Sequence, residues 1–147
     1  MKYIGFDREE DAELWARKRL GIDAPPSFFR AMSAVDDDGE FVCVVVLTNF
    51  NAFNIDVNIV IDAKKMRPKE TIVMYNEVFG FLFDKLKVKR LTGLTRESNA
   101  KARNLNPQFG FKLEGTMRKA YNGEEDLLVY GMLPEEYHNH KWYRHGT

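Results

Sequence analysis

The sequence predicts an α/β protein, and three observations in its central part carry that prediction. Residues 41–48 (FVCVVVLT) form an almost wholly apolar, β-branched run, which is typical of a central strand buried on both faces. Residues 55–61 (IDVNIVI) alternate apolar and polar side chains with the strand period of two. Residues 68–87 repeat apolar side chains at helical spacing over a broad face, as in a helix packed on a sheet. The order strand–helix–strand–helix–strand over residues 55–121 implies at least one right-handed crossover.

The first third of the chain adds one helix and one or two strands. We predict a short strand over residues 1–6 and a helix that starts at Asp7 and ends at Gly21. Its first half is acidic and its end is basic, as the helix dipole prefers. A strand over residues 28–36 then leads into the turn Asp37-Asp38-Gly39, a hairpin signal. The residues of the helix expected to face the core are Leu14, Trp15 and Leu20.

Three further strands are expected in the last third, over residues 88–95, 111–121 and 125–133. A short helix lies between the first two of these strands, with Ser98 or Asn99 as its cap. Pro107 should tolerate no helix across it, and Gly110 supplies the positive φ that a helix exit often needs. The turn Asn122-Gly123 joins the last two strands as a hairpin, and Pro134 opens a terminal helix.

Composition limits the classes of function. No linker or repeat divides the 147 residues, so we predict a single domain over residues 1–147. The 22 Lys and Arg residues balance the 22 Asp and Glu residues, so no overall charge draws the chain to nucleic acid. No signal peptide and no apolar run of about 20 residues is evident, so we expect a cytoplasmic, soluble protein with no membrane partner. The single cysteine, Cys43, lies in an apolar run and should be buried, which leaves no disulfide and no cysteine metal site.

A basic cluster precedes the long helix. It comprises Lys64, Lys65, Arg67 and Lys69. The helix dipole disfavours cations at this end by about 0.3–1 kcal/mol each, whereas the free N–H groups there hold anions. The cluster is therefore either a site for a phosphate-bearing ligand or a solvated basic loop.

The stretch from residue 95 to residue 118 resembles a known family. The residues that carry the resemblance are Asn99, Leu105, Phe109, Gly110-Phe111, Glu114-Gly115 and Arg118. Their order and spacing resemble the C-terminal half of GNAT-superfamily N-acetyltransferases. The branch that acetylates ribosomal-protein N-termini, and acetyltransferase-like proteins of tailed phages, look most similar. The resemblance covers residues 55–133 and implies a GNAT-like α/β fold, with a mixed, mostly antiparallel sheet flanked by helices on both faces.

The resemblance also implies a co-substrate, acetyl-CoA, and no metal. In the family the pantetheine arm pairs with the strand that matches residues 55–61, and the loop after it wraps the pyrophosphate. That loop is normally rich in glycine, whereas MRPKET at residues 66–71 has none. The cofactor-binding residues implied for this chain are Ile59, Val60, Ile61, Arg67, Pro68, Lys69, Glu70, Thr71, Asn99 and Arg103.

Catalysis of acetyl transfer to an amine requires a base for the amine proton. Asp56 is the first candidate and Glu114 the second, although each is also an ordinary polar residue of a strand. Glu114 and Arg118 share a face of one strand, and we expect them to form an ion pair. Many GNAT enzymes protonate the departing thiolate with a Tyr at the position that Asn106 occupies here. The possible substitutes are Tyr121, Tyr130 and Ser98.

Two functions remain open from the sequence. The first is an acetyl-CoA-dependent N-acetyltransferase that acts on a primary amine, which can be a protein N-terminus, a lysine or a small amine. The second is a GNAT-shaped binding or interaction protein, of the phage-encoded kind, that has lost catalysis. The three histidines near the C-terminus, His138, His140 and His145, are expected in a solvated tail rather than at a metal.

Overall fold

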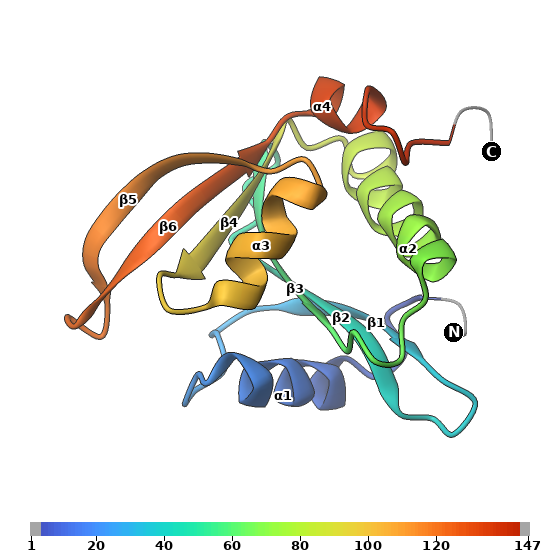
Figure 1. The fold of residues 1–147 in the computed structure, drawn as a ribbon, viewed down its shortest axis with the longest axis horizontal. Coiled ribbons are helices and arrows are strands. Elements are labelled where there is room, and N and C mark those ends of the chain that lie inside the picture. The colour runs from blue at the N-terminus through green and yellow to red at the C-terminus, as the bar shows by residue number, and fades with distance from the viewer. Residues whose placement is uncertain (1–3, 145–147) are drawn as a thin grey trace.

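The fold comes from a computed structural model that describes residues 4–144. Its helices and strands follow one another along the chain as Figure 1 shows. They are α1 (Glu9–Leu20), β1 (Arg30–Val35), β2 (Phe41–Thr48), β3 (Asn54–Ile61), α2 (Pro68–Gly80), the π-helical turn η1 (Phe81–Lys85), β4 (Arg90–Arg96), α3 (Ala100–Gln108), β5 (Lys112–Tyr121), β6 (Glu125–Met132) and α4 (Pro134–His138). Of the strand expected over residues 1–6, residues 1–3 lie outside the described part, and Gly5 forms an isolated bridge with Ser33.

One six-stranded sheet contains all the strands, in the order β1-β2-β3-β4-β6-β5. Only β3 and β4 run parallel, and α2 lies in the crossover that joins them; the other neighbours are antiparallel. In Figure 1, α1 lies on one side of β1–β3, whereas α2 and α3 lie on the other. The predicted mixed, mostly antiparallel sheet with helices on both faces is therefore confirmed.

Two clusters of buried side chains hold these layers together. The larger joins the sheet to α2 and to the C-terminal segment, and the smaller lies between the sheet and α1. β2 contributes to both, with Cys43 and Val45 on the α2 side and Val44 and Val46 on the α1 side. The prediction that this strand is buried on both faces is confirmed. Burial also raises the pKa of the Cys43 thiol to about 12, so the residue is an apolar core residue.

The first helix packs on the sheet through small side chains. It begins at Glu9 rather than at Asp7, and it ends at Gly21, whose φ of 69° is left-handed as expected. Leu14 was predicted to face the core, but it is 39% exposed. The buried residues of the helix are Ala12, Glu13 and Ala16. Because two of these three are alanines, the helix axis can approach the sheet closely.

The long helix and the short helix both end differently from expectation. The long one turns from α- to π-helical geometry after Gly80 and stops before Lys87, which has a φ of 62°. The short one continues through Pro107 to Gln108, so the prediction that Pro107 ends it is wrong. A proline in the last turn removes only one helical hydrogen bond, which is a small loss. Gly110 then leaves the helix with a φ of 95°, as predicted.

The last two strands form a long hairpin that extends away from the body of the protein (Figure 1). Asn122 and Gly123 both have positive φ, at 54° and 70°, as a tight hairpin turn requires. β5 is exposed along nearly its whole length, and its register with β6 breaks twice. At the second break, Lys119 has a φ of 57° and its N–H donates to Asp126 Oδ1 at 2.8 Å. Within residues 4–144, no helix is both long and apolar enough to cross a bilayer.

Candidate functional site

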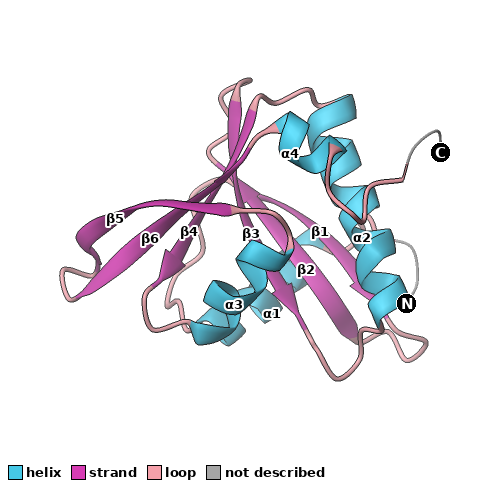
Figure 2. Cartoon of the chain, turned by 45° about the horizontal axis from the view of Figure 1, so that its top comes forward, coloured by secondary structure: helices cyan, strands magenta, loops and turns pink. Residues whose placement is uncertain are grey.

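β3 and β4 are paired over three residues only. The pairs are Asn54 with Arg90, Ile55 with Leu91, and Asp56 with Thr92. Beyond them, β3 remains paired with β2, and β4 remains paired with β6. Figure 2 shows the two strands separating toward α3. The sheet therefore consists of two three-stranded halves that meet at a closed end and leave a gap at the other end.

Backbone groups of β3 face this gap at alternate residues. The Phe53 carbonyl accepts two N–H groups from the start of β4, at 2.7 and 3.1 Å, so residue 53 faces β4. The Asp62 N–H donates to β2 at 2.8 Å, so residue 62 faces the other way. Because successive residues of a strand turn to opposite neighbours, Val60 bonds toward β2. The residues whose backbone N–H and C=O groups face the gap are Val57, Ile59 and Ile61.

A narrow cavity of about 50 Å³, here called the wedge cavity, lies in the gap. Its walls come from both strands, from α3 on one face of the sheet and from the end of α1 on the other. The lining residues include Leu20, Ile22, Val57, Asn58, Ile59, Thr95, Asn99, Ala102 and Asn106. Residues from both faces of the sheet therefore line the cavity. Asn58 lies on the polar face of the alternating strand β3, and that alternation was the sequence signal for its position.

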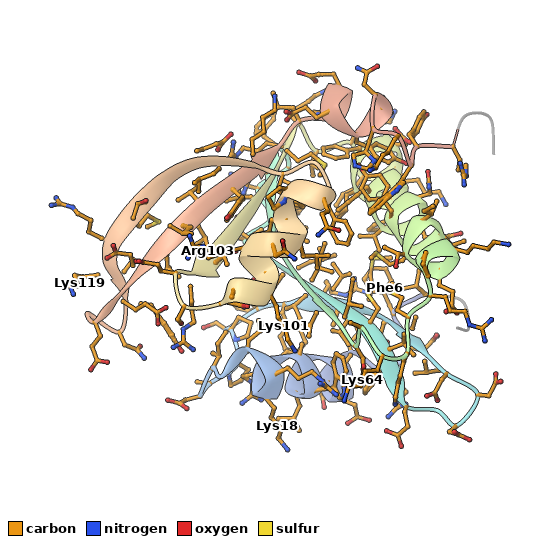
Figure 3. All side chains as sticks on the ribbon, viewed as in Figure 1. Phe6, Lys18, Lys64, Lys101, Arg103 and Lys119 are labelled. Carbon is orange, nitrogen blue, oxygen red and sulfur yellow. The ribbon has the colours of Figure 1, made fainter. Side chains whose placement is uncertain are left out.

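A larger groove of about 470 Å³, the α2–α3 groove, lies on the α3 side of the wedge cavity. Three of the predicted cofactor residues line it, namely Ile61, Pro68 and Thr71. Lys101 lines it from α3, and Figure 3 labels this residue just below α3 in that view. The groove therefore lies between the start of α2 and α3, beside Ile61 at the end of β3.

The start of α2 is only partly available to an anion. The Arg67 N–H donates to Glu70 Oε1 at 3.0 Å, so a carboxylate of the chain already caps this end. Of the basic cluster, Lys65 lies 3.4 Å from Asp36 and is engaged away from the groove. Lys64, Arg67 and Lys69 are exposed. Three cations of the cluster thus remain near the helix N-terminus, together with Lys101.

Asn99 and Arg103 hold the start of α3 in place. Asn99 Oδ1 accepts the Ala102 N–H at 3.1 Å, and the Asn99 side chain also lines the wedge cavity. The two alternatives for this residue, a helix cap and a contact with a ligand, are therefore compatible. Arg103 donates to the Glu97 carbonyl at 3.0 Å, which braces the turn before α3.

The two candidate catalytic carboxylates belong to one chain of hydrogen bonds across the closed end, here called the clamp. Its members, in order, are Glu114, Arg90, Thr92, Asn54, Asp56 and Asn49. Arg90 donates to Thr92 Oγ1 at 2.9 Å, and Asp56 accepts from the amides of Asn49 and Asn54 at 2.8 and 3.1 Å. By strand alternation Asp56 lies on the same face of β3 as Asn58, the α1 face, but it does not line the wedge cavity.

Glu114 makes its ion pair with Arg90 and not, as expected, with Arg118. The two oxygens of Glu114 accept from Arg90 at 2.6 and 3.1 Å. β5 breaks register between Leu113 and Gly115. Glu114 therefore does not follow the regular alternation of side chains that predicted Arg118 as its partner. The hydrogen bond from the Arg90 guanidinium holds the pKa of the Glu114 carboxyl below its usual value, and the same contact raises the pKa of Arg90.

Thr95 and Asn106 form a pair on the α3 side of the wedge cavity that the sequence analysis missed. Asn106 Nδ2 lies 3.1 Å from Thr95 Oγ1, and both side chains line the cavity. In either orientation of the amide, one donor forms this bond and another N–H or O–H remains. The alternation in RLTGLTR placed Thr95 on one face of β4, but nothing local indicated its partner on α3.

The three residues considered as substitutes for a catalytic tyrosine lie in different places. The Tyr121 hydroxyl donates to the Gly21 carbonyl at 3.3 Å, near the α1 end of the wedge cavity. Tyr130 is buried in the main core. The Ser98 N–H donates to Glu125 at 2.6 Å. None of the three side chains lines the wedge cavity.

The histidines that the structure describes bind the C-terminal segment to the body of the protein. His138 Nε2 lies 2.9 Å from Asp84 Oδ1, and His140 Nε2 lies 3.0 Å from the Gln108 carbonyl. His145 lies outside the described residues. In the described part of the chain, no three His, Cys, Asp or Glu side chains group in a way that suits a metal ion.

Comparisons with known proteins agree on the fold. No protein-family model and no curated protein sequence matches this chain. A probable acetyltransferase of known structure is 19% identical, with a TM-score of 0.67 over 90% of this chain and 93% of that one. A chimera of the Vibrio cholerae spermidine N-acetyltransferase SpeG and hSSAT is 16% identical, with a TM-score of 0.69 over 94% and 100% of the two chains.

A GNAT-family acetyltransferase from Bacillus anthracis is 15% identical, with a TM-score of 0.59 over 71% of this chain and 66% of that one. At these identities the likeness concerns the fold. The TM-scores of 0.59–0.69 show that the overall arrangement of the chain is similar to that of these structures. This chain has the fold of the GNAT acetyltransferases.

Proposed function

We propose that this protein is an acetyl-CoA-dependent N-acetyltransferase that moves an acetyl group to a primary amine. The observation that carries the proposal is the wedge cavity, which residues from both faces of the sheet line and which lies where β3 and β4 are no longer paired. One face of the sheet can receive the acyl donor and the other the amine. The two reactants then meet inside the gap, and such proximity is worth several orders of magnitude in rate.

The residues on the donor side fit acetyl-CoA. The pantetheine arm carries amide groups that can pair with the gap-facing backbone of Ile59 and Ile61, as an added strand would. The α2–α3 groove offers about 470 Å³ beside it, the size of many ligand sites. Arg67, Lys69 and Lys101 can pair with the phosphates, since Pro68 has no N–H to donate.

The residues on the acceptor side fit a neutral amine. Asp56 remains our candidate for the base, because it lies one strand period, about 6–7 Å, from Asn58 on the α1 face. Glu114 remains the second candidate, at the far end of the clamp. On the donor side, the spare N–H or O–H of the Thr95–Asn106 pair is available to the departing sulfur.

Thermal unfolding with and without acetyl-CoA tests the proposal. Ligand at a hundredfold excess over its Kd should stabilise the fold by about 2.7 kcal/mol, which gives a clear rise in melting temperature. Desulfo-CoA should give a similar rise, and free adenosine a much smaller one. If saturating acetyl-CoA leaves the melting temperature of the folded protein unchanged, the proposal loses its support.

A second function is a GNAT-shaped binding protein without catalysis. The observation that favours it is Glu70, whose carboxylate caps the start of α2 where a phosphate would bind. The glycine-free loop points the same way. Absence of both an acetyl-CoA shift and CoA release with any amine would favour this second function.

A further inference from the structure

Three hollows on the molecule share lining residues and so form one continuous path. The wedge cavity shares Leu20, Ile22 and Asn58 with a groove of about 250 Å³ on the α1 face, the acceptor groove. The acceptor groove in turn shares Pro26 and Thr48 with an open hollow of about 680 Å³ beyond the ends of β1 and β2, the aromatic hollow. An acceptor whose amine lies in the wedge cavity can therefore extend through the groove into the hollow.

Two exposed phenylalanines line the aromatic hollow. Phe28, on the segment before β1, is 88% exposed, and Phe50, on the turn after β2, is 53% exposed. Phe53 on the same turn is 68% exposed but does not line the hollow. Exposed apolar surface of this kind, gathered in a hollow, is typical of an interaction site. The path thus ends at a surface suited to an apolar side chain.

The charges along the path do not suit a polycation. The charged lining residues of the acceptor groove are Glu13 and Arg17, and Arg30 lines the aromatic hollow. Glu13 is only 5% exposed, and both its oxygens accept from Arg17, at 3.2 and 3.0 Å. Arg30 is paired with Glu9 at 2.7 Å, and Arg96, which lines the wedge cavity, is paired with Glu125 at 3.0 Å. The single carboxylate among the described residues that line the path, Glu13, is therefore already paired, and a polyamine, which needs negative partners along its length, would find none there.

The path leads out of the wedge cavity toward the acceptor groove, and hydrogen bonds join the elements on the opposite side. On the opposite side, the β4 and β5 strands are joined to the end of α1 by two hydrogen bonds. Arg96 Nη1 donates to the Leu20 carbonyl and Tyr121 to the Gly21 carbonyl, both at 3.3 Å. A chain end can enter such a path, whereas a lysine in the middle of a polypeptide needs room for the chain on both sides.

We infer that the acceptor is the N-terminal amine of a polypeptide whose next few residues include an apolar side chain that binds between Phe28 and Phe50. This inference rests on the proposed function. In the reaction, a bond forms between the amine nitrogen and the acetyl carbon, and the bond from that carbon to sulfur breaks. The nitrogen loses one proton and the sulfur leaves to become the thiol of CoA, so the products are an N-acetyl peptide and CoA.

The test compares acceptors in the presence of acetyl-CoA, with CoA thiol release as the rate and mass spectrometry as proof of product. The panel contains a hexapeptide with Leu at positions 2–4, the same peptide with Ser there, an N-terminally blocked peptide with an internal Lys, and spermidine. The Leu peptide should have the highest kcat/KM, roughly tenfold or more above the Ser peptide, as one filled apolar pocket provides.

Matched variants locate the apolar contact. Phe28→Ser and Phe50→Ser should each raise KM for the Leu peptide by roughly tenfold, with kcat and the rate for the Ser peptide unchanged. Phe53→Ser, which changes a phenylalanine outside the hollow whose exposure lies between those of Phe28 and Phe50, should alter neither KM nor kcat. Because all three side chains are exposed, the melting temperatures should stay the same, which shows that the variants are folded.

Several outcomes would overturn the inference. Preference for spermidine or for the blocked lysine peptide would do so and leave the proposed function intact. Equal rates for the Leu and Ser peptides, or an effect of Phe53→Ser equal to that of Phe28→Ser, would exclude the aromatic hollow as the binding surface. Failure of the proposed function is recognised separately, because acetyl-CoA would then cause no thermal shift.

Discussion

The closed and open ends of the gap between β3 and β4 have the same two strands but opposite properties. At the closed end, three residue pairs and the side-chain clamp from Glu114 to Asn49 join the two halves of the sheet. At the open end, the strands keep their outer partners and turn their inner backbone groups toward a cavity. The difference indicates that a short, heavily bonded junction can hold the halves together, which leaves the rest of the gap for a ligand.

The largest expected effect concerns the carboxylate at the closed end. If Asp56 accepts the amine proton, Asp56→Asn keeps its shape but removes the base, and kcat/KM should fall by about 10²–10⁴-fold. Acetyl-CoA binding should be unchanged, and the loss should shrink at high pH, where the amine is already neutral. Initial rates against pH with the best acceptor provide the measurement. A wild-type rate at neutral pH would leave Glu114→Gln as the next variant to test.

Two proline substitutions distinguish the N–H groups of β3 that bond toward β2 from those that face the gap. Val60→Pro removes an N–H that bonds toward β2 and should reduce the free energy of unfolding by about 1–3 kcal/mol, because a buried acceptor loses its partner. Ile59→Pro removes an N–H that faces the gap and should cost less stability. It should instead weaken acetyl-CoA binding by about 0.5–1.5 kcal/mol, the worth of one hydrogen bond. Denaturant unfolding and calorimetric titration measure the two effects; equal losses of stability would contradict the orientation assigned to β3.

Substitution of the basic residues at the start of α2 should have a moderate effect, and only on CoA binding. Arg67→Ala and Lys69→Ala should each weaken CoA binding by about threefold, since an exposed charge pair is worth up to ~1 kcal/mol. The double variant should also depend less on salt, because fewer charges are screened. Titrations at two ionic strengths measure this, with Lys65→Ala as a control, since Lys65 lies beside Asp36. Unchanged affinity in the double variant would identify the cluster as a solvated loop.

The smallest effect concerns the stability of the clamp against acid. The folded protein lowers the pKa of Glu114 below its ordinary value of about 4.3, through Arg90. The stabilisation of the fold by the Glu114–Arg90 ion pair is therefore fully present above the ordinary pKa of Glu114. It is lost as the pH falls through the lower pKa of Glu114 in the folded protein. Because the Glu114 side chain is 41% exposed, it should amount to less than ~1 kcal/mol. Glu114→Gln should accordingly unfold with a flatter acid limb; an identical pH profile would show that the ion pair contributes nothing.

The elements of this fold were predictable from the sequence because each one has local signals. The run Phe41–Thr48 was identified with its observed bounds, and the turn at Asn122-Gly123 and the exit at Gly110 followed from backbone chemistry. The gap was not predictable from residues alone, because it arises where β4 pairs with β6, a strand some thirty residues later. For the same reason the Arg90–Glu114 and Thr95–Asn106 contacts were missed.

The site residues that the family resemblance implied also divide into those placed by nearby sequence and those placed by contacts between distant residues. Pro68, Thr71 and Asn99, which the family resemblance implied, lie on the groove or the cavity. Asp56 and Glu114 are joined through Arg90, a residue that no local pattern singled out. Whether these residues perform the roles implied for them stays a prediction that the variants above test.

The break in register at Lys119 has a consequence for how copies of this protein behave toward one another in concentrated solution. A long edge strand presents a row of N–H and C=O groups to which another chain can add. The left-handed residue at position 119, fixed by the bond from its N–H to Asp126, twists the outer edge of β5 out of line. The basic side chains of Arg118 and Lys119 lie at the same place. A straightened β5, for example after deletion of Lys119, would therefore turn the exposed hairpin into a template for fibrous aggregation.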